Sequence, residues 1–508
     1  MFKTLFVLAA LAVTLEAAQI QWTGYANDNQ WTTNNNWFPN TVPGPNDDVT
    51  IAKGTVYITI PTGVNSLDMG TDVDTPANLT LYHAFTVANN QALNVHANGN
   101  LIVNSGLEAI TGTFNIDGTL TFNSGYLSGL WTISSRGTGY FPGEGQRNIA
   151  AGSLTNNGKL EISGIVGLNQ SGVLINKGSI DATGSAAFFV FDTSNANVDS
   201  SSGSLSFSGS IFRFQAPTKI GTFTLTSGNV EIYNQVTFAN PLSIPSGSTV
   251  SSLGTASVSF PALSGGGAVV ASGATTTFSA LNGLAAVTAA GGATSFTQAA
   301  QVGTLTISGG NINFGANVAG TTTNIQGGII GGSGSVSGAA VNINTVGCNI
   351  NTAILIPTVG TVTAGSLISF ASSGSINGGG NLTIEKQFNV TGPTGVAGVN
   401  VSGTIAIASS TTFFSQNIPV YGTGGLQIAQ AGTFVVSTTQ VQVAKVVLSQ
   451  GSSFSGFNAA LSIGSIANAV ATDAVLAVLG DYSLAAIGQF ENVRTPSAGT
   501  PQKFAFSA

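Results

Sequence analysis

Glu161 and Asp181 are the two carboxylates whose spacing could support chemistry. The segment 155–163 aligns with 175–183, and the alignment puts these carboxylates at equivalent positions. If the segments are strands of successive coils, the two side chains would lie ~5 Å apart on one face. That separation suits the carboxylate pair of a retaining glycosidase. Lys159, two residues before Glu161, would share the face and neutralise it, so we favour the alternative of a solvated outer face.

Three aspartates and two histidines are candidate metal ligands. Asp68, Asp72 and Asp74 resemble part of a calcium loop, but the order of the consensus and its closing bidentate Glu are missing. His83 and His96 share no spacing typical of a metal site. We therefore expect a polar loop and surface histidines, with no metal and no cofactor.

Four aromatic residues gather near the N-terminus. Trp22, Tyr25, Trp31 and Trp37 follow one another closely, and the only other tryptophan is Trp131. They could form a platform on which glycans stack. They could also close the end of a repeat fold, where core and strand edges need a cap. We favour the cap because the cluster lies where such a fold would begin.

The remaining single residues of interest concern covalent modification. The one cysteine, Cys348, excludes an intrachain disulfide, and we expect a small buried side chain, with intermolecular pairing as the alternative. On a secretory route, Asn-X-Ser/Thr sequons could carry glycans. They occur at Asn78, Asn169, Asn381, Asn389 and Asn400.

Charge is scarce, which excludes several classes of protein. The 508 residues contain 12 Lys+Arg and 19 Asp+Glu, so no basic face for nucleic acid is expected. The chain is 43% hydrophobic, which argues against disorder. From 232 to 472 the only charged residues are Glu385, Lys386 and Lys445, so this half offers no carboxylate pair for acid–base catalysis. We predict that the protein is not an enzyme.

Short alternating runs rich in Val, Ile, Thr and Phe, separated by Gly, Asn and Ser, predict an all-β fold. The repeat of 155–163 at 175–183, and a second alignment of 221–232 with 303–314, favour a parallel β-helix, that is, a β-solenoid. Asn156 and Asn176 are candidates for a stacked amide ladder. A string of β-sandwiches is the alternative, but no Pro-rich linkers and no domain-scale restart are present.

The N-terminal segment carries a family resemblance. Its pattern consists of Trp22-Thr-Gly, then Asn36-Trp, then 42–51 (Val-Pro-Gly-Pro-Asn-Asp-Asp-Val-Thr-Ile). This pattern is similar to the opening of secreted β-helix surface proteins of protists and bacteria, which are adhesin-like or pectate-lyase-like. The resemblance covers only the stretch 22–51. It implies a single right-handed parallel β-helix with an aromatic-rich N-terminal cap and an extracellular location, and it implies no one function.

The expected organisation has four parts. Residues 1–18 are a signal peptide, with Lys3 before an apolar run, 5–15, that is too short to span a bilayer. An N-terminal cap (19–60), the parallel β-helix (61–458) and a C-terminal cap or final coils (459–508) follow. No later segment is expected to span a membrane.

These observations predict a secreted glycoprotein at the cell surface or in the extracellular space. It would be a rod-like structural or adhesive protein that associates with itself into a fibre, matrix or coat. Extracellular glycans would be further partners, and nucleic acid would not. The alternative is a glycan-binding module, or a polysaccharide lyase or hydrolase, on a β-helix scaffold.

Overall fold

The computed structural model describes most of the chain from residue 17 to residue 484. The described ranges are 17–88, 90–143, 145, 147–190, 196–343, 348–356, 361–364, 367–370, 375–378, 381–384, 388–391, 398–401, 404–416, 419–437, 440–449, 451–457, 460–468, 475–479 and 482–484. The predicted leader, apart from its positions 17 and 18, and the stretch 485–508 therefore lie outside it.

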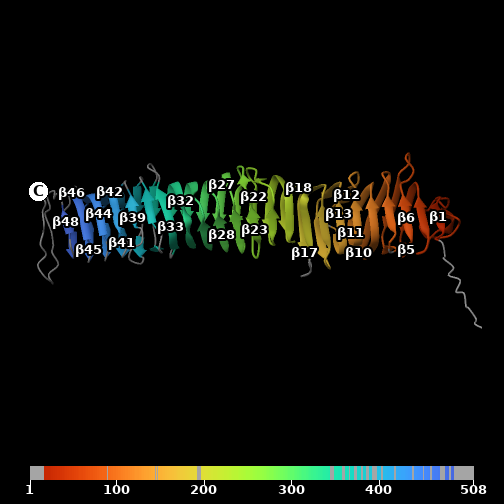
Figure 1. The fold of residues 1–508 in the computed structure, drawn as a ribbon, viewed down its shortest axis with the longest axis horizontal. Coiled ribbons are helices and arrows are strands. Elements are labelled where there is room, and N and C mark those ends of the chain that lie inside the picture. Colours follow the sequence, from red (N-terminus) through yellow and green to blue (C-terminus); the bar gives the residue numbers. More distant parts are fainter. Residues whose placement is uncertain are drawn as a thin grey trace, which may run out of the picture. The chain divides into compact units, whose positions relative to one another are not determined.

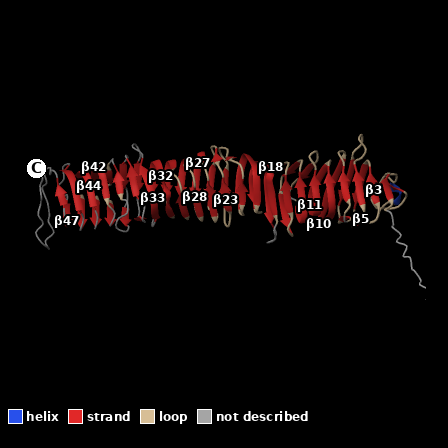
Figure 2. Cartoon of the chain, viewed as in Figure 1, coloured by secondary structure: helices blue, strands red, loops and turns tan. Residues whose placement is uncertain are grey.

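The chain folds as an all-β parallel β-solenoid of about 17 turns, which confirms the predicted fold class (Figures 1 and 2). It divides into unit 1, Met1–Leu205, and unit 2, Ser206–Ala508. The described residues contain no α-helix, only the short 3-10 helix η1 (Asn34–Asn36). None of them forms a helix long and apolar enough to cross a membrane.

The strands of unit 1 are β1 (Gln19–Trp22), β2 (Trp37–Phe38), β3 (Asp48–Ile51), β4 (Gly54–Ile58), β5 (Thr62–Val64), β6 (Ser66–Met69), β7 (Ala77–Leu81), β8 (Phe85–Val87), β9 (Ala92–Val95), β10 (Gly99–Ile116), β11 (Thr119–Ile133), β12 (Thr138–Phe141), β13 (Arg147–Asn156), β14 (Lys159–Ile162), β15 (Ile165–Asn169), β16 (Val173–Asn176), β17 (Ser179–Val190) and β18 (Asn197–Phe214), which contains the unit boundary.

The strands of unit 2 are β19 (Thr218–Ile232), β20 (Val236–Phe238), β21 (Leu242–Ser243), β22 (Thr249–Ser252), β23 (Ser257–Phe260), β24 (Leu263–Ser264), β25 (Ala268–Ala271), β26 (Thr275–Phe278), β27 (Leu281–Ala289), β28 (Ala293–Phe296), β29 (Ala300–Ile307), β30 (Asn311–Phe314), β31 (Val318–Ile325), β32 (Ile329–Ile343), β33 (Cys348–Ile356), β34 (Thr361–Ala364), β35 (Leu367–Phe370), β36 (Ser375–Gly378), β37 (Asn381–Ile384), β38 (Phe388–Thr391), β39 (Val399–Val401), β40 (Ile405–Ile407), β41 (Thr412–Gln416), β42 (Val420–Ile428), β43 (Thr433–Ser437), β44 (Gln440–Leu448), β45 (Ser453–Phe457), β46 (Ala460–Asn468), β47 (Val475–Leu479) and β48 (Tyr482–Leu484).

Within the described part of each unit, successive coils pair in parallel, and the only antiparallel pair of strands there is β1 with β2. Asn156 pairs with Asn176, which confirms the first sequence alignment. Coil length varies elsewhere. The coil from Thr304 to its partner Thr322 is shorter than the coil from Asn156 to Asn176. The coil from Leu382 to its partner Ile405 is longer. The strands β46 to β48 continue the same parallel register.

The second alignment, of 221–232 with 303–314, does not describe the register and is wrong. It matches Asn229 with Asn311. In the structure Asn229 pairs with Thr249, and the chain of pairs continues through positions 268 and 286 to Thr304. The segment around Thr304 therefore stacks on the end of β19, not on 221–225. Different strands of one coil share the same alternation of small polar and apolar residues, so similarity alone matched the wrong face.

Like side chains stack inside the coils. In unit 2 five phenylalanine rings form one column, with centroids 5.0 to 5.7 Å apart and planes within 28° of parallel. Every ring is at most 4% exposed. Such stacks combine burial of large apolar surface with favourable ring geometry. The column consists of Phe238, Phe260, Phe278, Phe296 and Phe314.

The predicted amide ladder is present in unit 1. Asn156 Nδ2 donates to Asn176 Oδ1 at 2.8 Å, and Asn176 Nδ2 donates to Ser200 Oγ at 2.8 Å. All three residues are at most 1% exposed. Buried amides are tolerated because the coil repeat supplies a partner on the next rung.

An aromatic cluster lies near the N-terminus. Trp22 and Trp31 both pack edge-on against Trp37, with ring centroids 4.9 and 4.7 Å apart. These three rings are at most 7% exposed, whereas Tyr25 is 84% exposed. β1, which contains Trp22, pairs in parallel with β3.

Phe278→Ala should lower the free energy of opening of the surrounding coils by about 3–5 kcal/mol, because it leaves a cavity between two stacked rings. Amide hydrogen exchange in β23, β26 and β28 measures this. Thr277→Ala, on the outward side of the same strand, is the control and should cost less than about 0.5 kcal/mol. Equal effects of the two variants would show that the ring column does not hold the coils together.

Asn176→Ala should lower the free energy of unfolding by about 1–3 kcal/mol, because buried partners on both neighbouring rungs lose a hydrogen bond. Asn115→Ala is the matched control, since Asn115 donates a comparable 2.9 Å bond to Asn94 but is exposed. Thermal unfolding of both variants should therefore show a lower midpoint for Asn176→Ala alone. A comparable fall for Asn115→Ala would contradict the role of burial.

Candidate functional site

The candidate site lies on one outward strand face of unit 1, which we call the Tyr140 face. It is formed by β4, β7, β12 and β14 with the first residues of β10, β11 and β17 (Figure 1). Two columns of side chains alternate with the buried rungs of the core. The first column is Thr55, Asn78, Asn100, Thr119, Thr138, Lys159 and Ser179, and the second is Tyr57, Thr80, Ile102, Thr121, Tyr140, Glu161 and Asp181.

The charged end of this face has the geometry that the sequence predicted. Glu161 pairs with Asp181 on the next coil. Lys159 Nζ lies 2.7 Å from Glu161 Oε1 and 3.5 Å from Asp181 Oδ2. The hydrogen bond and the charge of Glu161, followed by the charge of Asp181, raise the pKa of Lys159 above its ordinary 10.5. One ammonium thus bridges both carboxylates.

A hollow of about 380 Å³ lies beside this triad. Tyr140, which is 38% exposed, and the Phe141–Pro142 corner line it together with the three charged side chains. The remaining lining residues are Ile162, Ser163 and Thr183. The hollow therefore combines an aromatic ring, hydroxyls and carboxylates.

A buried arginine holds the rim of the hollow. Arg147 is 0% exposed, and its guanidinium donates to the carbonyl oxygens of Pro142, Gly143 and Ile165. Burial lowers the pKa of Arg147. Sequence reasoning missed Arg147 and Tyr140. One coil step back from Glu161 could have indicated Tyr140, whereas nothing in the sequence marks Arg147 as buried.

The acidic loop and the histidines do not lie in this site. Asp72 accepts the backbone N–H groups of Asp74 and Thr75, which lower its pKa, and Lys53 lies 3.6 Å from it. Asp68 lies 3.4 Å from His96 Nε2.

His83 Nδ1 lies 3.1 Å from Glu108 Oε1. The pKa of Glu108 is lowered, first by the Ala84 backbone N–H and then by His83. Among the described residues, no group of three or more His, Cys, Asp or Glu side chains could hold a metal ion.

The sequons fall in different settings. Asn78 is a rung of the Tyr140 face, where its Oδ1 accepts a 3.2 Å bond from Asn100 Nδ2. Asn169 ends β15, and Asn400 is exposed on β39. The side chains of Asn381, Asn389 and Cys348 lie outside the described part of the structure.

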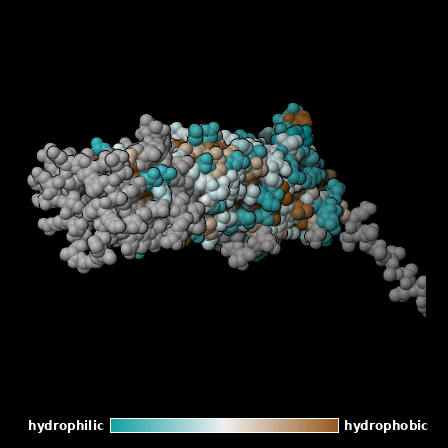
Figure 3. All heavy atoms as spheres, turned by 60° about the vertical axis from the view of Figure 1, so that its left-hand side comes forward, coloured by the Kyte–Doolittle hydropathy of each residue, from teal (hydrophilic) through white to brown (hydrophobic). Residues whose placement is uncertain are grey.

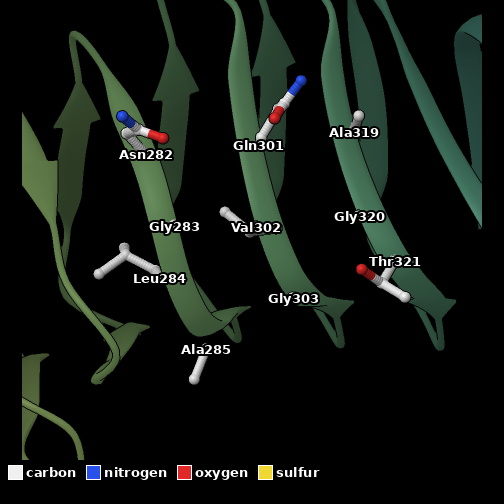
Figure 4. Close-up of a pocket in the computed structure, with 10 residues that line it drawn as sticks. All are labelled: Asn282, Gly283, Leu284, Ala285, Gln301, Val302, Gly303, Ala319, Gly320 and Thr321. Atoms are coloured by element: carbon white, nitrogen blue, oxygen red, sulfur yellow. The ribbon is translucent and has the colours of Figure 1, made fainter.

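A second hollow, of about 480 Å³, lies in unit 2 on β27, β29 and β31 (Figure 4). Asn282, Gln301 and Ala319 stack along one edge of it. A Cβ at Gly303 would lie 2.5 Å from the Ala285 carbonyl oxygen, so glycine is required there. The lining of this hollow is uncharged, which excludes acid–base chemistry there.

Comparison of the chain with protein families, with curated proteins and with solved structures found no match.

The structure predicts which carboxylate controls Lys159. Glu161→Gln should lower the Lys159 pKa toward 10.5 by more than Asp181→Asn does, because the shorter hydrogen bond is the larger cause. A pH titration of Lys159 side-chain resonances measures both shifts. A larger fall in the Lys159 pKa with Asp181→Asn than with Glu161→Gln would contradict this geometry.

The same raised pKa fixes the pH range of the ion pair. Because the folded-state value exceeds 10.5, the contribution of Lys159 is fully present at neutral pH, and on the alkaline side it is lost as the pH rises through the raised value.

Proposed function

We propose that the chain is an extracellular structural or adhesive protein whose copies associate into a fibre, a matrix or a surface coat. The observation that supports this most is an uncharged stretch within unit 2. No Asp, Glu, Lys, Arg or His occurs from residue 233 to residue 384. Stacked outward rungs such as Thr288, Thr306 and Asn324 present hydroxyls and amides instead.

Such a surface favours contact with a second copy. Like charges on exposed strands normally oppose association between sheets, and this stretch has none. Ile329 adds an apolar side chain that is 53% exposed. In Figure 3 the deepest colours, both hydrophilic and hydrophobic, lie over the N-terminal coils, and paler colours prevail over the visible middle coils. Copies would therefore meet through hydrogen bonds and apolar contacts.

The proposal places the protein outside the cell. The residues of the predicted leader, 1–18, and the five sequons support that location. So does the resemblance of the N-terminal segment to secreted parallel β-helix surface proteins. The fold itself supports a scaffold, because each coil adds surface without requiring a new core.

The proposal also treats the protein as non-enzymatic. The Lys159 bridge supports this, since a carboxylate pair that shares one ammonium is poorly placed to divide into an acid and a base.

Analytical ultracentrifugation of the full mature chain tests the proposal. We expect concentration-dependent multimers at both low and high salt, because contacts without charge are little affected by screening. Thr288→Lys combined with Thr306→Lys places two like charges on adjacent rungs of unit 2 and should shift the protein toward monomer.

Asn115→Lys combined with Thr132→Lys is the matched control, since it charges two adjacent rungs of unit 1 and should leave the multimers intact. A monomer at every concentration of the wild-type chain would refute self-association.

A further inference from the structure

The Tyr140 face carries aromatic rings at two places, and the rungs between them are uncharged, whereas Lys159, Glu161 and Asp181 lie at one end. Tyr57 and Tyr140 belong to the same column, separated by four rungs, which is about 19 Å at the usual spacing between strands. Tyr82 is 44% exposed, and its ring centroid lies 6.3 Å from that of Tyr57. Tyr57 itself is half-buried, so the exposed rings at the two ends of this run are those of Tyr82 and Tyr140.

Most rungs between and beside the rings are donors and acceptors of modest size, although the column between Tyr57 and Tyr140 also contains the apolar Ile102 and the buried Thr80. Asn78, Asn100 and Thr119 form the neighbouring column, and Thr121 precedes Tyr140 in its own column. Amides and hydroxyls donate and accept at once, as sugar hydroxyls do. Apolar ring faces beside such groups suit the apolar faces of pyranose rings.

We propose that the Tyr140 face binds an extended, neutral polysaccharide, with a β-linked hexose polymer as the chemical class. Successive coils pair in parallel along this face, so the matching ligand is an extended ribbon whose sugars follow one another along the rungs. A coiled α-linked glucan would not meet Tyr57 and Tyr140 together.

The charges at one end select against acidic polymers. Lys159 contributes +1 and Glu161 and Asp181 contribute −2, so these rungs carry −1 in total, and the ammonium is already engaged. A uronate or sulfated chain would meet a net negative charge on these rungs. Neutral sugars would instead donate hydroxyl hydrogens to the carboxylate oxygens in the adjoining hollow.

The Asn78 sequon adds a requirement to the proposal. Asn78 lies on the rung next to Tyr57, its amide is bonded to Asn100, and the sequon threonine, Thr80, is only 5% exposed. An N-linked glycan at Asn78 would cover the face between the two ring positions. The proposal therefore requires that Asn78 be unmodified in the native protein.

Co-sedimentation of the full-length protein with insoluble cellulose and chitin tests the proposal. We expect binding to at least one of them and about tenfold weaker binding for Tyr57→Ala and for Tyr140→Ala, as loss of one stacked ring implies. Tyr25→Ala and Tyr233→Ala, exposed tyrosines outside this face, are the controls and should bind as wild type. Unchanged thermal midpoints ensure that the variants are folded.

Several outcomes would overturn the proposal. They are equal binding by the Tyr57→Ala/Tyr140→Ala double variant, loss of binding in Tyr25→Ala alone, preference for soluble polygalacturonate, absence of binding to either solid, or full glycan occupancy of Asn78 by mass spectrometry. Loss with Tyr25→Ala would assign the site to the N-terminal aromatic cluster. Thr288→Lys/Thr306→Lys should still bind, which separates this proposal from self-association.

Discussion

Parallel in-register hydrogen bonding between successive coils is the constraint on which the rest of this structure depends. Each strand lies about 4.7–4.9 Å from its equivalent on the next coil, so every side chain has a neighbour of the same orientation at that distance. Inside, this yields the phenylalanine column around Phe278 and the amide ladder of Asn156 and Asn176. Outside, it yields the triad of Lys159, Glu161 and Asp181. A disulfide-free chain can be ordered in this way because each rung is a template for the next.

The same constraint allows the outward rungs of the two units to differ in chemistry. In unit 1 the outward rungs include charges, amides and tyrosines, so that surface can discriminate among ligands by chemistry. In unit 2 the outward rungs from 233 to 384 are uncharged, so that surface offers little opposition to another neutral sheet. Under the two proposals, recognition and association would rest on different coils of one architecture.

The sequence was sufficient for the fold class and for one register, but not for the whole site. The repeat that contains Glu161 and Asp181 was readable because both strands share a turn of the same length. The alignment of 221–232 with 303–314 failed because coil lengths vary and the several strands of a coil look alike. Tyr140 escaped because its strand resembles β14 only in alternation. The burial of Arg147 depends on a corner whose shape no local pattern encodes.

The direction of the hydrogen bonds between coils has a mechanical consequence. In each unit these bonds point from coil to coil, so tension that pulls neighbouring coils apart is shared by all the bonds of one coil at once. Tension applied to a free chain end instead peels away one strand after another and breaks few bonds at a time. A filament that grips such a unit by its side surfaces would therefore resist far greater force than one tethered through an end of the polypeptide.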